Sequence, residues 1–294
     1  MPTWNENHRY SVIDGRHPVI EYSLPEGEFY VPNDVELESS KEQILLITGP
    51  NMSGKSALLR QTALISILAQ MGSFVPAKSA NLSILDRLFV RVGANDNLSA
   101  GESTFMVEMS ETASILNGLT ERSLVLLDEI GRGTATYDGL SIAQSITEYL
   151  HSHPFKPLTL FATHYHELAS LEESCERVSN KHVSVLEDDG DIVFLRKLEP
   201  GGSNHSFGIH VARMAGMPQT VVLRAKDLLK ELEQLHGHKS ENSSDLGTNY
   251  QMSLVQWESP EVEALKKELE QLDVNAIAPI DALLLIQRWK SLFK

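Results

Sequence analysis

A glycine-rich motif between a strand-like and a helix-like stretch constrains this chain more than any other feature of its sequence. Residues 49–56 read GPNMSGKS and fit the pattern G-x-x-x-x-G-K-S. The apolar run 44–48 precedes the motif, and the helix-like stretch 55–71, which Gly72 ends, follows it. This order favours a loop whose backbone N–H groups and helix N-terminus surround phosphate oxygens. A chance glycine-rich turn is the alternative, and the strand and helix around the motif disfavour it.

Every residue of this motif is a candidate nucleotide-binding residue. The candidates are Gly49, Pro50, Asn51, Met52, Ser53, Gly54, Lys55 and Ser56. Lys55 is expected to reach the terminal phosphates, and the Ser56 hydroxyl is expected to bind Mg²⁺. The motif thus predicts a nucleoside triphosphate with its magnesium ion.

Two acidic residues follow a second apolar run. Residues 124–128 read LVLLD, and Glu129 comes next. The pattern predicts a buried strand that places Asp128 beside Mg²⁺ and Glu129 next to an attacking water, as general base or water-positioner. An acid pair after a strand is usually a solvated strand end, but the phosphate loop favours the functional interpretation here.

A histidine follows a third apolar run. Residues 158–162 read LTLFA, and His164 comes two residues later. It is expected at the same sheet edge, in contact with the γ-phosphate or the attacking water. Three other histidines near it in sequence leave a metal site open as an alternative, although no cysteine or acid cluster supports one. They are His151, His153 and His166.

The alternation of short apolar runs with helix-like stretches predicts an α/β fold with a mostly parallel central sheet flanked by helices. Residues 183–186 and 192–195, on either side of DDGD, predict an antiparallel hairpin. Residues 104–119 predict a further amphipathic helix. Its expected apolar face consists of Met106, Met109, Ala113 and Leu116.

Composition excludes several classes of protein. The 294 residues contain no run of about 20 apolar residues, which a membrane span needs, and we expect a cytoplasmic protein with no membrane partner. The net charge of −15 argues against a dedicated nucleic-acid surface on this chain. Cys175, the single cysteine, excludes an internal disulfide framework.

The C-terminal part differs in composition from the rest. Residues 1–235 are expected to form the main domain, and 236–258, rich in Ser, Asn, Gly and charge, a flexible linker. Residues 259–294 predict two short amphipathic helices. Helices this short need to pack on each other and on a partner, which predicts an oligomerisation tail.

Four long motifs in one order resemble the MutS family of DNA mismatch repair proteins. Residues 48–56, 93–116, 128–143 and 161–168 are similar to that family's phosphate loop, its STFMVEM segment, its DEIGRGT stretch and its FATHYHEL segment. A GRHP sequence at 15–18 strengthens the resemblance, which covers about residues 8–235.

The resemblance implies an ABC-type P-loop ATPase that works as a homodimer. Each ATP would lie between one subunit's phosphate loop and the other's signature segment, here 98–102, so Ser103 at the following helix start would act in trans. An ordinary helix cap is the other interpretation of Ser103. An aromatic residue near 30–34 would stack on adenine, with Tyr30 aligning best and Phe29 as the alternative. Residues 203–233 would close the dimer interface, although intrachain packing is equally compatible with them.

The resemblance also implies ATP hydrolysis in mismatch repair, in a bacterial cell and close to the nucleoid, with a MutL-type partner. The family's mismatch-reading part has no counterpart here, so recognition of mismatched DNA would belong to a parent protein. One alternative is a MutS paralogue with a nuclease tail, or another ABC-type machine acting in recombination or on ribosomes. The third hypothesis is an interaction module that binds nucleotide without hydrolysing it. Glu129 argues against this hypothesis, because a module that only binds nucleotide would not need it.

A short peptide in the linker predicts one more partner. Residues 251–255 read QMSLV and resemble the peptide that bacterial repair proteins offer to the replication sliding clamp. Its candidate contacts are Gln251, Met252, Ser253, Leu254 and Val255. A hydrophobic lead-in to the following helix is the alternative.

Overall fold

The computed structural model describes residues 1–93, 103–188, 191–202 and 207–237. By its internal contacts the chain divides into Met1–Glu231 and Leu232–Lys294. The segment 98–102, the peptide 251–255, the tail 259–294 and nearly all of the predicted linker lie outside the described residues. The predictions made for them stay predictions.

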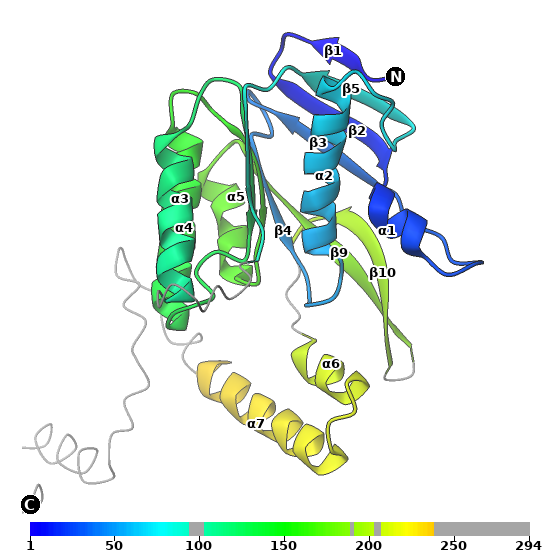
Figure 1. The fold of residues 1–294 in the computed structure, drawn as a ribbon. Coiled ribbons are helices and arrows are strands. Elements are labelled where there is room, and N and C mark those ends of the chain that lie inside the picture. The colour runs from blue at the N-terminus through cyan, green and yellow to red at the C-terminus, as the bar shows by residue number, and fades with distance from the viewer. Residues whose placement is uncertain (94–102, 189–190, 203–206, 238–294) are drawn as a thin grey trace, which may run out of the picture. The chain divides into compact units, whose positions relative to one another are not determined.

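A six-stranded sheet forms the centre of the first unit (Figure 1). Its strands, in spatial order, are β10 (Asp191–Pro200), β9 (Val178–Asp188), β4 (Ile44–Thr48), β8 (Leu158–Ala162), β7 (Ser123–Asp128) and β6 (Arg87–Arg91). All neighbouring pairs are parallel except β9 and β10, which form an antiparallel hairpin. The predicted mostly parallel α/β sheet and the predicted hairpin are both confirmed.

Successive residues of the central strands point into two different cores. In β4, Leu45 and Ile47 belong to one buried cluster, and Ile44 and Leu46 belong to the other. A strand buried on both faces needs apolar side chains at every position, which explains the unbroken run at 44–48. The same alternation holds for β7, where Leu124 and Leu126 lie opposite Val125 and Leu127.

The two faces of this sheet are covered by different layers. One face packs against α2 (Lys55–Gln70) and a second sheet, in which β1 (Thr3–Asn5), β5 (Ser79–Ser83), β2 (Arg9–Gly15) and β3 (Asn33–Glu38) follow in that order. The other face packs against α3 (Thr104–Asn117), α4 (Thr136–Ser152), the 3₁₀ turn η2 (His166–Ser170) and α5 (Leu171–Ser174).

The remaining helices are α1 (Pro18–Ser23), α6 (Gly208–Met214) and α7 (Gln219–Gly237). Helix α2 ends at Gln70, and Gly72 follows with a φ of 78°, as its position in the sequence predicts. Among the described residues, no helix is long and apolar enough to cross a membrane.

The predicted apolar face of α3 is wrong in part. Met106 is 59% exposed, and the buried residues of the helix are Glu108, Thr112 and Ile115. Met109 and Leu116 are partly buried against the core. The buried stripe therefore includes Met109 and Leu116 but is centred about one residue away from the predicted one, and it carries a charged side chain.

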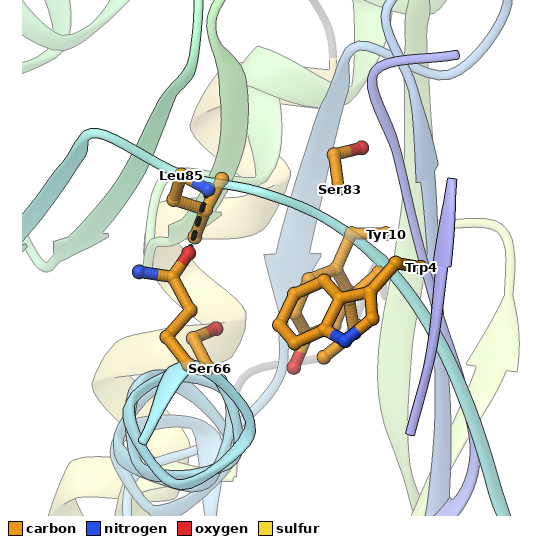
Figure 2. A pocket seen from close by; sticks show the side chains of 7 residues that line it. Trp4, Tyr10, Ser66, Ser83 and Leu85 are labelled. Carbon is orange, nitrogen blue, oxygen red and sulfur yellow. Dashed lines mark hydrogen bonds between the residues drawn. The ribbon is translucent and has the colours of Figure 1, made fainter. Parts of the chain in front are cut away.

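A narrow pocket with no room for a water molecule lies between α2 and the second sheet (Figure 2). Trp4, Tyr10 and Leu85 line it together with Ser66 of α2. Ser66 comes eleven residues after Lys55 in the helix, which separates the pocket from the phosphate-loop end of α2 by about 16 Å. The pocket is a gap between layers and is not part of the candidate site.

Candidate functional site

Three parallel strands bring the predicted site residues to one edge of the sheet. Strand β8 lies between β4 and β7, and all three end at this edge. The Thr163 N–H donates to the Ile47 carbonyl at 3.0 Å, and the Glu129 N–H donates to the Ala162 carbonyl at 2.8 Å. These bonds tie the three strand ends together, at the position where open parallel sheets bind ligands.

The 49–56 loop has the backbone conformation of a tight, inward-turning segment. Gly49, Met52 and Gly54 have φ values of 140°, 67° and 104°. Gly54 is the N-cap residue of α2, and its left-handed conformation carries little steric cost only for glycine. The loop therefore leads directly into a helix N-terminus, where unpaired N–H groups favour an anion.

Lys55 is buried at the centre of this loop. Its ammonium group donates to the Gly49 carbonyl at 2.7 Å and to the Pro50 carbonyl at 3.1 Å. The Glu129 carboxylate lies 3.8 Å from it. Burial lowers the pKa of Lys55, and the charges of Glu129 and Asp128 oppose that shift.

Asp128 is a buried carboxylate with an unused oxygen. Burial raises its pKa, and the Ser56 hydroxyl beside it opposes the shift. Among the residues that the structure describes, its Oδ1 atom has no hydrogen-bond partner. Buried polar atoms are normally satisfied, so this oxygen next to a hydroxyl fits a hard cation such as Mg²⁺.

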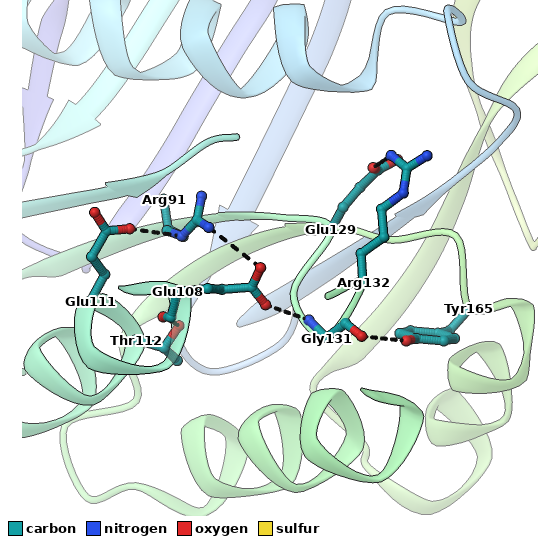
Figure 3. A network of polar contacts seen from close by, with 8 residues as sticks. All are labelled: Arg91, Glu108, Glu111, Thr112, Glu129, Gly131, Arg132 and Tyr165. Carbon is teal, nitrogen blue, oxygen red and sulfur yellow. Dashed lines mark hydrogen bonds and ion pairs between the residues drawn. The ribbon is translucent and has the colours of Figure 1, made fainter. Parts of the chain in front are cut away.

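Glu129 has an unusual backbone conformation. Its φ is 51°, a left-handed value that costs a non-glycine residue on the order of 1–3 kcal/mol. Its carboxylate pairs with Arg132 (Figure 3) and lies 3.8 Å from the Lys55 ammonium group. Strain of this kind persists only where surrounding contacts hold it in place.

His164 follows β8 and lies in the field of the same charged residues. Burial lowers its pKa, the Glu129 charge raises it, and the charges of Arg132 and Lys55 lower it further. The imidazole is therefore neutral near pH 7. Its Nδ1 atom is buried and has no hydrogen-bond partner within the described part of the chain. Nor does that part contain a group of three or more His, Cys, Asp or Glu side chains placed to hold a metal ion.

The two candidate aromatic residues differ in their surroundings. Phe29 is 89% exposed. Tyr30 is half-buried, and its hydroxyl donates to Gln61 Oε1 on α2 at 3.0 Å. The structure thus anchors Tyr30 to the helix that follows the 49–56 loop and leaves Phe29 in solvent.

Ser103 lies at the N-cap position of α3, as predicted, with an extended backbone. Its hydroxyl makes no capping bond to the helix, so the predicted side-chain cap is wrong. Its carbonyl accepts the first helical bond, from Val107 N–H at 3.1 Å. The preceding segment 98–102 lies outside the described residues.

Sequence reasoning missed four residues near this edge. Arg132 pairs with Glu129, the Glu108 carboxylate accepts from the Gly131 N–H, and the Tyr165 hydroxyl donates to the Gly131 carbonyl (Figure 3). Arg132 is visible in the sequence three residues after Glu129. The other three residues lie within the motifs at 93–116, 128–143 and 161–168, but their contacts could not be predicted, because these join segments 23 to 34 positions apart.

Comparisons with known proteins agree with this geometry. The family model described as MutS domain V matches residues 45–233. The chain is 56% identical over 292 residues to the DNA mismatch repair protein MutS of Christiangramia forsetii, which covers 98% of this chain and 34% of that protein. It is 58% identical over 284 residues to the protein of the same name from Cytophaga hutchinsonii, a match that covers 95% of this chain and 33% of that protein. It is 57% identical over 290 residues to the protein of that name from Flavobacterium johnsoniae, a match that covers 98% of this chain and 33% of that protein.

The chain spans about a third of the length of these curated relatives. The matched range begins within β4 and includes the 49–56 loop, both acidic residues and His164. The family model matches most of the chain, and these relatives are more than half identical to it. This chain therefore belongs to the MutS family.

Proposed function

We propose that this chain binds and hydrolyses ATP as the P-loop ATPase module of a mismatch repair protein. The observation that carries the proposal is the convergence of Lys55 with Asp128 and Glu129. Lys55 comes from the loop after β4, and both acids come from the end of β7. A buried lysine in a glycine loop, facing two carboxylates from another strand, is the arrangement that phosphoryl transfer requires.

Phosphate binding follows from the 49–56 loop. Its N–H groups and the N-terminus of α2 offer donors and partial positive charge to the β- and γ-phosphates. Lys55, already held at the loop centre by two carbonyls, adds a full charge there. Ser56 and Asp128 would hold Mg²⁺, whose charge offsets that of the phosphates when it is bound.

Hydrolysis is assigned to Glu129 and His164. The Glu129 carboxylate lies beside Lys55, and so beside the γ-phosphate position, where it orients a water and accepts its proton. His164 is neutral near pH 7 and lies in the same charged surroundings, so it can hydrogen-bond the water or the γ-phosphate. The adenine ring is assigned to Tyr30, because Gln61 fixes its position relative to α2.

The same proposal includes the dimer. The N-terminus of α3, beginning after Ser103, would point at the γ-phosphate held by a second copy of the chain. The relatives are named for DNA mismatch repair, which supports a role in that process and a MutL-type partner. Their name does not favour the alternative of a paralogue acting in recombination or on ribosomes.

A turnover assay on the purified 294-residue chain tests the ATPase proposal. With ATP and Mg²⁺ we expect steady phosphate release that depends on Mg²⁺ and disappears in Lys55→Ala. Binding of ATP without release, in wild-type chain at protein concentrations that allow dimers, would favour a nucleotide-gated module without catalysis.

The clamp partner rests on residues 251–255 alone, which lie outside the described residues. Such a peptide orders on binding, so its affinity for the clamp should be weak. A labelled peptide of residues 247–258 should bind the clamp saturably. The same peptide with Gln251→Ala and Leu254→Ala is the control. No saturation up to about millimolar peptide would remove this partner.

A further inference from the structure

A buried carboxylate on α3 has no role in the site described so far. Glu108 is 8% exposed, and its Oε2 lies 3.4 Å from Nη2 of the buried Arg91. Its Oε1 accepts a hydrogen bond from the Gly131 N–H at 2.6 Å. A charge is rarely buried unless it is paired and fully bonded. Glu108 is paired with Arg91, which also contacts Glu111 at 2.8 Å, and it accepts from the Gly131 backbone N–H on its other side (Figure 3).

The carbonyl group of Gly131 is held by a second side chain. The hydroxyl of the buried Tyr165 donates to the Gly131 carbonyl at 2.9 Å. Burial raises the pKa of Tyr165, so the hydroxyl keeps its proton and remains a donor. The Tyr165 ring also packs against the His164 ring, with 4.1 Å between centroids. Gly131 is therefore held between a helix and the segment that carries His164.

Gly131 comes two residues after Glu129, whose left-handed backbone needs external support. One support is the bond from Glu129 N–H to Ala162 on β8. The two bonds to Gly131 fix the far side of the same turn. A turn held at both ends keeps the Glu129 side chain directed toward Lys55.

We propose that Glu108 and Tyr165 are positioning residues for hydrolysis: together they hold Gly131 by its N–H and its carbonyl and thereby fix the Glu129 carboxylate beside the γ-phosphate position. The inference rests on the proposed ATPase function. Neither residue touches substrate. Their loss should lower kcat and leave ATP binding intact, because ground-state contacts of the 49–56 loop are unchanged while the reacting geometry loosens.

Steady-state turnover of the full chain tests this, with thermal melting as a check on folding. Tyr165→Phe keeps the ring and removes the donor, so kcat should fall about tenfold with KM for ATP within about twofold. Glu108→Ala should lower kcat at least as much. Glu108→Gln should recover most of that loss, since its amide oxygen can still accept from Gly131. Thr112→Val is the matched control, because the Thr112 hydroxyl lies in the same buried face of α3 and bonds only its own helix, at Glu108 O.

The decisive measurement combines Tyr165→Phe with Glu129→Gln. If Tyr165 acts through Glu129, its replacement should not lower the slow residual turnover of Glu129→Gln any further. An equal tenfold loss in both backgrounds, or wild-type kcat in Tyr165→Phe, would overturn the inference. If Glu108→Ala does not fold, Tyr165→Phe alone still decides it. Absence of turnover in the wild-type chain would instead reject the proposed function, so the two failures are distinguishable.

Discussion

The Glu129 carboxylate lies 3.8 Å from the Lys55 ammonium, and both side chains are largely buried. Each charge is also held by a second partner: Lys55 by the loop carbonyls and Glu129 by Arg132. This relationship brings together the cation that we propose binds phosphate and the candidate base. It also separates their roles, because Lys55 belongs to the loop and Glu129 to the neighbouring strand end.

The first prediction uses that separation. Glu129→Gln should lower kcat by about 100-fold or more, because it removes the proton acceptor, while the Kd for ATP changes little. Lys55→Ala should weaken ATP binding itself by about tenfold or more, through loss of a charged hydrogen-bond donor. Fluorescent-nucleotide titration and phosphate release measure the two effects. Wild-type turnover by Glu129→Gln would show that another group serves as the base.

The second prediction concerns the composite site. ATP should convert Glu129→Gln chains from monomer to dimer, and Ser103→Ala should weaken that conversion without changing nucleotide affinity at low protein concentration. Ser114→Ala is the control, since this exposed residue of α3 lies eleven positions, or about 16 Å, further along the helix. Analytical ultracentrifugation with and without ATP makes the comparison. A chain that stays monomeric with ATP at high concentration contradicts the assignment in trans.

The third prediction concerns the protonation of His164. Burial disfavours its charged form, so NMR titration should give a pKa below the ordinary 6.5. The Glu129 charge acts in the opposite direction, and therefore Glu129→Gln should lower that pKa further. His164→Asn identifies the resonance. If neutral His164 is required, the acid limb of the kcat profile lies below pH 6.5 as well. A pKa that rises in Glu129→Gln would mean that the two side chains do not interact as described.

The parts of this fold that were predictable depend on local sequence. Strands β4 and β8 coincide with the runs 44–48 and 158–162, because burial on both faces demands an unbroken apolar segment. The phosphate-loop candidates were visible for a similar reason. Glycines at positive φ and a helix start occur within eight consecutive residues.

The parts that were not predictable depend on contacts between distant segments. Glu108 reads as a solvated helix residue until its bond to Gly131, 23 positions away, is known. The buried side of α3 carries Glu108 and Thr112, and Met106 is exposed. The different surroundings of Tyr30 and Phe29 could not be predicted for the same reason. Tyr30 is held by a hydrogen bond to Gln61, which lies 31 positions later in the sequence.

The last prediction sets helix propensity against packing at Gly139, in the first turn of α4. Propensity alone predicts that Gly139→Ala stabilises the chain by about 1 kcal/mol. A Cβ at this position would instead overlap the Gly131 carbonyl and the Tyr165 hydroxyl, because the two glycine backbones are in close contact. Overpacking of this kind costs about 1–3 kcal/mol or more, and the overlap involves backbone that cannot rotate away. Gly139→Ala should therefore lower Tm by several degrees.

Gly208→Ala is the matched control, because Gly208 is exposed in α6 and has open space around its Cβ position. Its Tm should stay level or rise slightly. Since the overlap at Gly139 falls on the Gly131 and Tyr165 pair, Gly139→Ala should also lower kcat in whatever fraction remains folded. Differential scanning calorimetry followed by turnover at a temperature well below both Tm values checks each part. A Tm for Gly139→Ala at or above wild type would mean that the α4 helix can move away from Gly131, and the close packing described here would be wrong.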